Sequence, residues 1–234
     1  MGGEEGASRI VLPGDVVFDL AAQAQNKVLR LGSGLSQDAD RVVAIKAGRL
    51  NHAKSKLWVE GSQKRYIPSA EDSVIGIVID RRAEEFLVDL NAPVLGLLPI
   101  LSFEGATRKN IPNLKEGAVV YGRVVKAHRD ISPALSCLDA SGKGSGYGPL
   151  KEGYLFECST GLARSLLGTP TYPVLEALGK SLAFEIAVGV NGRVWVKSDA
   201  PATTVLVSNA IINSECLSAA QQHILVQKLL QAAK

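Results

Sequence analysis

The chain has 234 residues, of which 46% are hydrophobic, 21% charged and 5% aromatic. This composition is typical of globular domains and too apolar for intrinsic disorder. No run of about 18 uncharged apolar residues occurs, so we expect no membrane span, and the start MGGEEGASRI does not resemble a secretory signal. The three cysteines, Cys137, Cys158 and Cys216, are far apart, which predicts reduced thiols of a cytosolic or nuclear protein and no metal site.

The net charge of +3 is spread evenly along the chain. Lys plus Arg against Asp plus Glu gives 9 against 7 for residues 1–64, 10 against 10 for 65–146, and 7 against 6 for 147–234. No part has the basic excess expected of an autonomous nucleic-acid binder. If RNA is the partner, the chain would contribute a local basic patch to a site that other subunits complete.

The first part of the chain predicts a small β domain over residues 1–64. Residues 10–62 contain the short apolar runs VVFDL, KVLRLGSGL, RVVAIKAGRL and KLWVEG. Alternation and β-branched residues within these runs favour strands. Residues 1–8 are expected to be disordered.

The middle of the chain predicts a five-stranded OB barrel over residues 65–146. The strands are expected in SVIGIVIDRR, EEFLVDL, VLGLLPIL, AVVYGRVVKAHRD and PALSCLDA. The long polar connection SFEGATRKNIPNLKEG separates the third strand from the fourth, an arrangement typical of OB folds. A connection of this length usually carries function.

The last part predicts a mixed α+β domain over residues 147–234, preceded by the glycine-rich segment GKGSGYGP (142–149), a linker or hinge. GLARSLLG predicts a helix that starts at Ser159 or Thr160 and ends at Gly168, and PVLEALGK predicts a second helix. SLAFEIAVGVNGRVWVKS predicts a hairpin, and TTVLVSNAII a strand or a strand-to-helix run. The chain is expected to close with a helix in which Ala219, His223, Val226 and Leu230 recur at helical spacing.

Three stretches resemble the cap subunits of the RNA exosome, the exosome component three family of ribosomal-RNA-processing proteins. They are LSFEGATRKNIP (101–112), LSCLDASGKGSGYGPLKEGY (135–154) and VLEALGKSLAFEIAVGVNGRVW (174–195). The barrel is similar to that of ribosomal protein S-one, and the last domain to a divergent KH domain. The resemblance covers most of residues 65–215.

The resemblance implies a non-catalytic subunit in a hetero-oligomeric, ring-shaped complex. Its cap proteins guide single-stranded RNA toward a 3′–5′ exoribonuclease for RNA processing and degradation. The implied partners are the other ring and cap subunits, on which the N-terminal domain would dock. The implied location is the nucleus and nucleolus, and also the cytoplasm; no cofactor is implied.

The candidate RNA-binding residues are basic residues expected in or next to barrel loops. An OB barrel gathers such loops near its binding face, where basic side chains can follow a phosphate backbone. Each residue alone is typical of a solvated surface charge. The pair Arg108-Lys109, in the long polar loop, is the strongest candidate. The full set is Arg81, Arg82, Arg108, Lys109, Lys126, His128 and Arg129.

The sequence GVNG, with Gly189, Asn191 and Gly192, matches the G-x-x-G loop with which KH domains clamp nucleic acid. Here it lies between two expected strands, so a type I′ turn with Asn191 and Gly192 at positive φ is favoured. The loop that would join the KH helices, Gly168-Thr169-Pro170, offers no Lys or Arg to a phosphate. We therefore expect this domain to be a packing module and Trp195 to be a packing residue.

An enzymatic site is not evident. The barrel aspartates do not converge as a two-metal site requires, the histidines lack partners at metal or triad spacing, and the glycine-rich segment lacks the P-loop Lys-Ser/Thr pair. The aspartates are Asp80, Asp89, Asp130 and Asp139, and the histidines are His52, His128 and His223. One alternative is a free-standing RNA-binding factor of ribosome assembly or translation, which predicts tight binding by the isolated chain. The other is a ribonuclease subunit with its own site.

Overall fold

The computed structural model describes residues 9–20, 29–53, 55–61, 65–128, 131–168 and 171–232. The chain divides into two compact units, Met1–Ser62 and Gln63–Lys234. Within the described ranges, no helix is long and apolar enough to cross a membrane. The disorder expected for residues 1–8 lies outside these ranges.

The first unit is built from short strands in two small sheets, in agreement with the expected β domain. One sheet has the order β1-β6-β7-β3 and the other the order β2-β5-β4. Because side chains alternate between the two faces of a strand, residues such as Val42, Leu57 and Val59 are buried in a common core. The strands are β1 (Arg9–Val11), β2 (Val16–Asp19), β3 (Arg30–Leu31), β4 (Leu35–Asp38), β5 (Arg41–Ala44), β6 (Gly48–Ala53) and β7 (Lys56–Glu60).

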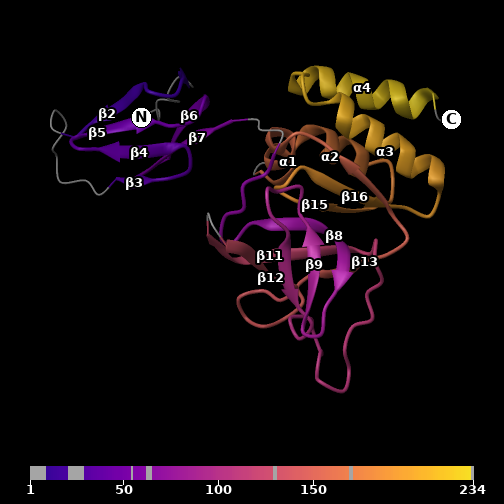
Figure 1. The fold of residues 1–234 in the computed structure, drawn as a ribbon. Coiled ribbons are helices and arrows are strands. Elements are labelled where there is room, and N and C mark those ends of the chain that lie inside the picture. The colour runs from indigo at the N-terminus through magenta and orange to yellow at the C-terminus, as the bar shows by residue number, and fades with distance from the viewer. Residues whose placement is uncertain are drawn as a thin grey trace. The chain divides into compact units, whose positions relative to one another are not determined.

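The second unit begins with the predicted barrel, which lies below the helices in Figure 1. Its sheet order is β12-β10-β9-β8-β11-β13, and β12 also pairs with β11, which closes the barrel. The last strand was not predicted: Gly148–Leu150 pairs with β11, although its first two residues were expected in the linker 142–149. The strands are β8 (Ser73–Arg81), β9 (Glu85–Asp89), β10 (Gly96–Pro99), β11 (Val119–His128), β12 (Ile131–Ser136) and β13 (Gly148–Leu150).

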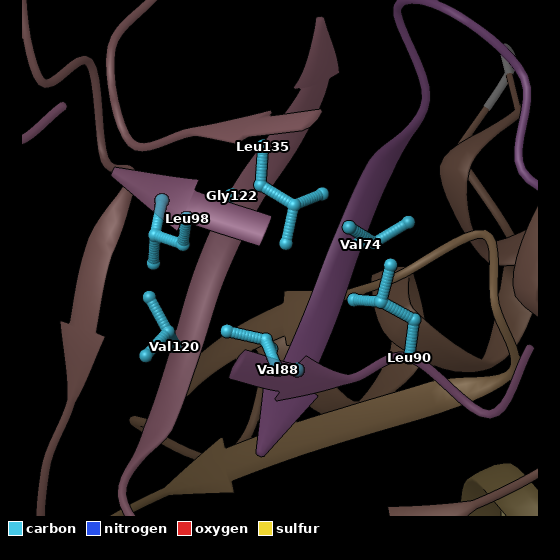
Figure 2. Close-up of a pocket in the computed structure, with 8 residues that line it drawn as sticks. Val74, Val88, Leu90, Leu98, Val120, Gly122 and Leu135 are labelled. Carbon is cyan, nitrogen blue, oxygen red and sulfur yellow. The ribbon is translucent and has the colours of Figure 1, made fainter. Parts of the chain in front are cut away.

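The barrel interior is a packed core and not a ligand cavity. Side chains from opposite strands, among them Val74, Val88, Leu98 and Val120, point toward one another (Figure 2). They leave a cavity of about 10 Å³, no larger than a single water needs, and its apolar lining gives water no partner. Any RNA contact must therefore use the outside of the barrel.

The second unit continues with a three-stranded sheet of order β14-β16-β15 and four helices, in agreement with the α+β prediction. Figure 1 shows α3 and α4 on the side of this sheet that faces away from the barrel. The N-cap of α1 is Ser159, whose hydroxyl accepts a hydrogen bond from Leu162 N at 3.0 Å. The elements are β14 (Tyr154–Glu157), α1 (Thr160–Leu167), α2 (Pro173–Gly179), β15 (Glu185–Val188), β16 (Arg193–Lys197), α3 (Pro201–Asn213) and α4 (Ala219–Ala232).

The last two helices differ in part from the expectation. TTVLVSNAII belongs entirely to helix α3 and contains no strand, because Val207, Ala210 and Ile211 pack on one helix face and Pro201 suits a first turn. In α4 the expected His223 is exposed, and the buried residues are Gln222 and Val226. Gln222 Nε2 donates to Tyr172 Oη at 2.7 Å and to two backbone carbonyls.

Strand β16 is buried on both faces because it lies between the helices and the barrel. Val194 and Val196 point into the core beneath the helices. Arg193 and Trp195 alternate with them and therefore point the other way. Trp195 is buried against Gly153, where even a Cβ would lie 2.3 Å from the indole ring. The expectation that Trp195 is a packing residue is confirmed.

Candidate nucleic-acid interface

The barrel topology separates the candidate basic residues into two groups. Strands β8 and β11 are antiparallel, with Val119 opposite Ile77 and Arg123 opposite Ser73. The end of β8 and the start of β11 therefore lie at one end of the barrel, which we term the loop end. The loop end comprises the β8–β9 turn (82–84), the connection 100–118 and the segment 137–147.

Arg81 and Arg82 lie at the loop end, where both have partners. Arg81 Nη1 donates to Asn113 Oδ1 at 3.4 Å, and its guanidinium lies 5.9 Å from the Phe86 ring centroid. Arg82 forms an ion pair with Glu85 at 3.6 Å. Such exposed contacts are weak and exchange easily, so both side chains can still reach a phosphate.

Arg108 and Lys109 form the tip of a tight turn in the connection 100–118, which also belongs to the loop end. Thr107 and Asn110 exchange backbone hydrogen bonds of 3.1 and 3.0 Å, and Asn110 N also donates to Thr107 Oγ1 at 3.1 Å. Both basic side chains are exposed, and no ion pair joins either of them to another described residue. The turn therefore presents to solvent two adjacent cations that have no ion pair with the described residues.

Lys126 and His128 lie at the opposite end of β11, at the turn toward β12. Lys126 lies seven positions after Val119, which corresponds to roughly 23 Å along an extended strand. Both side chains are exposed, and Arg129 lies outside the described residues. The two basic groups thus lie at opposite ends of the barrel. Strands β9 and β10, the second and third of the barrel, correspond to the face with which OB folds bind oligonucleotides. That face itself contributes no Lys or Arg, because the strands read EFLVD and GLLP.

Two further cations, which were not among the predicted residues, belong to the loop end. Lys115 lies beside Gly117, whose amide donates to Val78 O at 2.8 Å. Lys143 lies in the segment 137–147. The first residue of this segment, Cys137, donates its backbone N–H to Ser102 O of the connection 100–118 at 2.9 Å. The pattern Asp-x-Ser-x-Lys-x-Ser at 139–145 is typical of a loop that an Asp side chain organises, and would have identified Lys143.

The GVNG sequence joins the α+β region to the barrel. Val190 N donates to Ser73 O at 2.8 Å, and a Cβ on Gly189 would lie 2.6 Å from Ile75 N. The predicted type I′ turn is wrong in one respect: Gly192 has a φ of 81°, whereas Asn191 does not have a positive φ. Gly192 N donates to Gly189 O at 3.0 Å and Gly189 N to Arg193 O at 2.8 Å, as in a three-residue hairpin loop with a terminal left-handed glycine.

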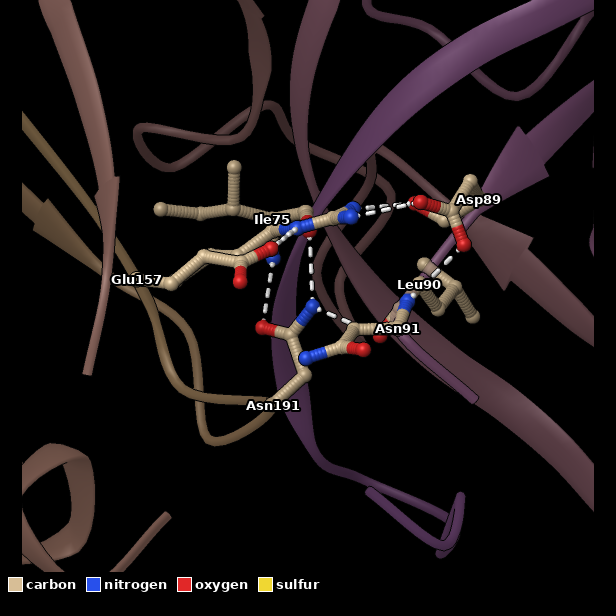
Figure 3. A network of polar contacts seen from close by, with 7 residues as sticks. Ile75, Asp89, Leu90, Asn91, Glu157 and Asn191 are labelled. Atoms are coloured by element: carbon tan, nitrogen blue, oxygen red, sulfur yellow. Dashed lines mark hydrogen bonds and ion pairs between the residues drawn. The ribbon is translucent and has the colours of Figure 1, made fainter. Parts of the chain in front are cut away.

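Asn191 is buried, and its amide replaces a missing strand neighbour (Figure 3). Pairing of β8 with β9 ends at Ile77 opposite Asp89, so Ile75 has no partner in β9. Asn191 Oδ1 accepts from Ile75 N at 3.2 Å, and Nδ2 donates to Ile75 O at 2.8 Å and to Leu90 O at 3.0 Å. These bonds leave no side-chain group of Asn191 for a nucleic acid.

An ion pair next to this amide also crosses from the α+β region to the barrel (Figure 3). Arg193 is buried; it donates to Asp89 O at 2.6 Å and Asp89 Oδ2 at 2.5 Å, and its Nε lies 3.6 Å from Glu157 Oε1. Burial alone would raise the pKa of Asp89. Hydrogen bonds from Arg193 and Asn91 N, together with the Arg193 charge, instead hold that pKa below its ordinary value. The GVNG segment and Arg193 thus form a structural joint between the α+β region and the barrel. We use this name for the contacts of Val190, Asn191 and Arg193 with Ser73, Ile75, Asp89 and Leu90.

Comparisons with known proteins agree with these features. Three family profiles match: the exosome complex exonuclease Rrp40 N-terminal domain at 29–65, the exosome complex component RRP40 S1 domain at 66–148, and a KH domain at 153–202. Exosome complex component rrp40 of Schizosaccharomyces pombe is 44% identical, over 94% of this chain and 93% of that protein. Exosome complex component RRP40 of Drosophila melanogaster is 42% identical, over 87% and 88%.

A solved structure described as an exosome complex RNA-binding protein has the same fold. Its TM-score is 0.59 at 21% identity, over 73% of this chain and 99% of that one. The barrel, the buried GVNG joint and the near full-length similarity to the two relatives lead to one conclusion. The chain belongs to the RRP40 family of exosome complex components.

Proposed function

We propose that this chain is a non-catalytic cap subunit of the RNA exosome. It contacts single-stranded RNA through the loop end of its barrel and guides the RNA toward a 3′–5′ exoribonuclease on another subunit. The observation that carries the proposal is the turn Thr107–Asn110, which presents Arg108 and Lys109 without ion pairs to other described residues. A turn closed by hydrogen bonds between Thr107 and Asn110 holds two cations close together, which lowers the entropic cost of binding a phosphate backbone.

A non-catalytic role is supported by what the described aspartates do. Asp89 binds Arg193, Asp139 accepts hydrogen bonds from its own loop, and Asp80 accepts from Arg81 N at 2.7 Å. Carboxylates engaged in this way serve the fold and are not aimed at a common metal position, as hydrolysis of a phosphodiester would need.

The proposal extends to the organisation of the protein in the cell. We assign residues 1–64 to a docking domain on the exosome ring, 65–146 to the RNA-binding barrel and 147–234 to a KH-like packing domain. The first strand of that last range, β13, pairs with the barrel strand β11. The partners are other ring and cap subunits, and the location follows the complex: nucleus and nucleolus, and also cytoplasm. The near-neutral charge of the barrel, 10 basic against 10 acidic residues at 65–146, supports a shared RNA path over autonomous binding.

The proposal is tested with the reconstituted exosome that carries Arg108→Ala and Lys109→Ala together. Each lost phosphate contact flattens the slope of log affinity against log salt by about 0.7 for a single strand. The slope should therefore flatten by about 1.4, with an affinity loss of about tenfold near 0.15 M salt. Lys228→Ala, at an exposed position of α4, is the matched control and should change neither quantity.

Two results would contradict the proposal. An unchanged salt slope in the double variant would remove Arg108 and Lys109 from the RNA path. Tight single-strand binding by the isolated chain at physiological salt would favour the free-standing RNA-binding factor. The thermal stability of the double variant should equal that of the wild type, because both side chains are exposed.

A further inference from the structure

The segment 137–147 is an ordered loop built around one carboxylate. Asp139 Oδ1 accepts from Ser141 N at 2.8 Å, Ser141 Oγ at 2.7 Å and Lys143 N at 2.9 Å, and Oδ2 accepts from Ser145 Oγ at 2.6 Å. Asp139 N returns a bond to Lys143 O at 2.8 Å. The hydroxyls of Ser145 and Ser141 and the amide of Lys143 hold the pKa of Asp139 far below its usual range.

The backbone of this loop adopts a conformation that needs such support. Gly142, Ser145 and Gly146 have φ values of 81°, 41° and 84°. Glycine adopts this region freely, but Ser145 does so only at a cost. A strained residue persists where its surroundings over-determine it, and such residues cluster at functional sites. Here the Ser145 hydroxyl bonded to Asp139 is the compensating contact.

The loop lies against the segment that carries Arg108 and Lys109. A Cβ added to Gly144 would come 3.4 Å from Glu104 Cβ, so Gly144 lies next to Glu104. Glu104 precedes Arg108 by four positions in the connection 100–118. Cys137 N and Ser102 O join them at the base, at 2.9 Å. Lys143, the neighbour of Gly144, is therefore held at the same end of the barrel.

Lys143 is exposed, and among the described residues neither Asp139 nor Glu104 forms an ion pair with its ammonium group. Asp139 binds the backbone of Lys143 and leaves the side chain free. We propose that Lys143 is a further phosphate contact for single-stranded RNA and that Asp139 is the positioning residue that holds it there. The inference rests on the proposed function of the loop end and adds a third cation to it.

The test compares Lys143→Ala, Asp139→Asn and their combination in the reconstituted exosome, with single-stranded RNA titrated at several salt concentrations. Lys143→Ala should flatten the salt slope by about 0.7 and weaken binding about fourfold near 0.15 M salt. Asp139→Asn should weaken binding less, because the lysine remains but is no longer held. In the Lys143→Ala background, Asp139→Asn should cause no further loss, since a positioning residue acts only through its partner.

Ser145→Gly provides a second variant if Asp139→Asn lowers incorporation into the complex. Glycine suits the φ of 41°, so this change removes the hydroxyl without adding strain, and it should weaken binding only when Lys143 is present. An unchanged slope in Lys143→Ala, with a flattened slope in the Arg108 and Lys109 double variant, would overturn this inference alone. An unchanged slope in both would overturn the proposed interface as well. A loss from Asp139→Asn that persists without Lys143 would end its assignment as a positioning residue.

Discussion

Replacing Asn191 with Ala tests the structural joint most sharply. The side chain is 1% exposed and makes three hydrogen bonds to backbone groups of the barrel. Its removal would leave Ile75 N, Ile75 O and Leu90 O without these partners. An unsatisfied buried polar group costs about 1–3 kcal/mol, so three such groups predict a loss of at least about 3 kcal/mol in the free energy of unfolding.

The assay is equilibrium unfolding in urea, followed by far-ultraviolet circular dichroism. With an m-value of about 2 kcal/mol/M, the predicted loss lowers the unfolding midpoint by at least about 1.5 M. Asn113→Ala is the matched control, because Asn113 is exposed and its side chain accepts a long bond of 3.4 Å from Arg81. A midpoint for Asn191→Ala equal to that of the control would refute the reasoning. A normal midpoint combined with lost RNA binding would show that GVNG is a nucleic-acid clamp.

Three further predictions concern the joint and the absence of catalysis. Gly192→Val should destabilise the fold by at least about 1–3 kcal/mol, because φ is 81° and a Cβ would lie 2.5 Å from Cys158 O; an unchanged melting temperature would contradict this. The pKa of Asp89 is lowered in the fold from an ordinary 3.8, so its ionised form adds stability above that pH, which is lost as the pH falls through the lower folded value. The stability difference between the wild type and Asp89→Asn should therefore be full at pH 7 and shrink in acid, and a difference independent of pH would be inconsistent with the ion pair. The purified chain should not cleave RNA in Mg²⁺ or Mn²⁺, and cleavage that disappears on mutation of Asp80 or Asp139 would show the prediction to be wrong.

The strands of the barrel were predictable because their residues alternate between core and surface. Val74, Val78 and Phe86 are buried as the pattern requires, and the polar connection after the third strand is where it was expected. Local signals were sufficient for these elements. The same signals misled at α3, where β-branched residues suggested a strand, although Val207, Ala210 and Ile211 have helical spacing.

The structural joint was not predictable, because its contacts are made between residues far apart in the sequence. Asn191-Gly192 is a strong local hairpin signal, but the contacts of Asn191 are with Ile75, 116 positions away. Arg193 likewise binds Asp89 across 104 positions. A single sequence does not reveal such pairs, so Asn191 was interpreted as a turn residue and Arg193 was overlooked.

The candidate interface was predictable only in part, for a similar reason. The residue types and their loops could be identified, but the grouping depends on the antiparallel pairing of β8 with β11. That pairing brings Arg81, Arg82, Arg108 and Lys109 to one end and leaves Lys126 and His128 at the other. Lys143 was missed because its glycine-rich surroundings suggested a linker.

Site-specific photo-cross-linking to RNA tests the central claim most directly. A benzophenone side chain placed at position 109 in the reconstituted exosome should cross-link to single-stranded RNA, because Lys109 is exposed at the tip of a hydrogen-bonded turn. The same probe at position 228, on α4, should remain unlinked. Equal labelling at both positions, or labelling at 228 alone, would contradict an RNA path at the loop end of the barrel.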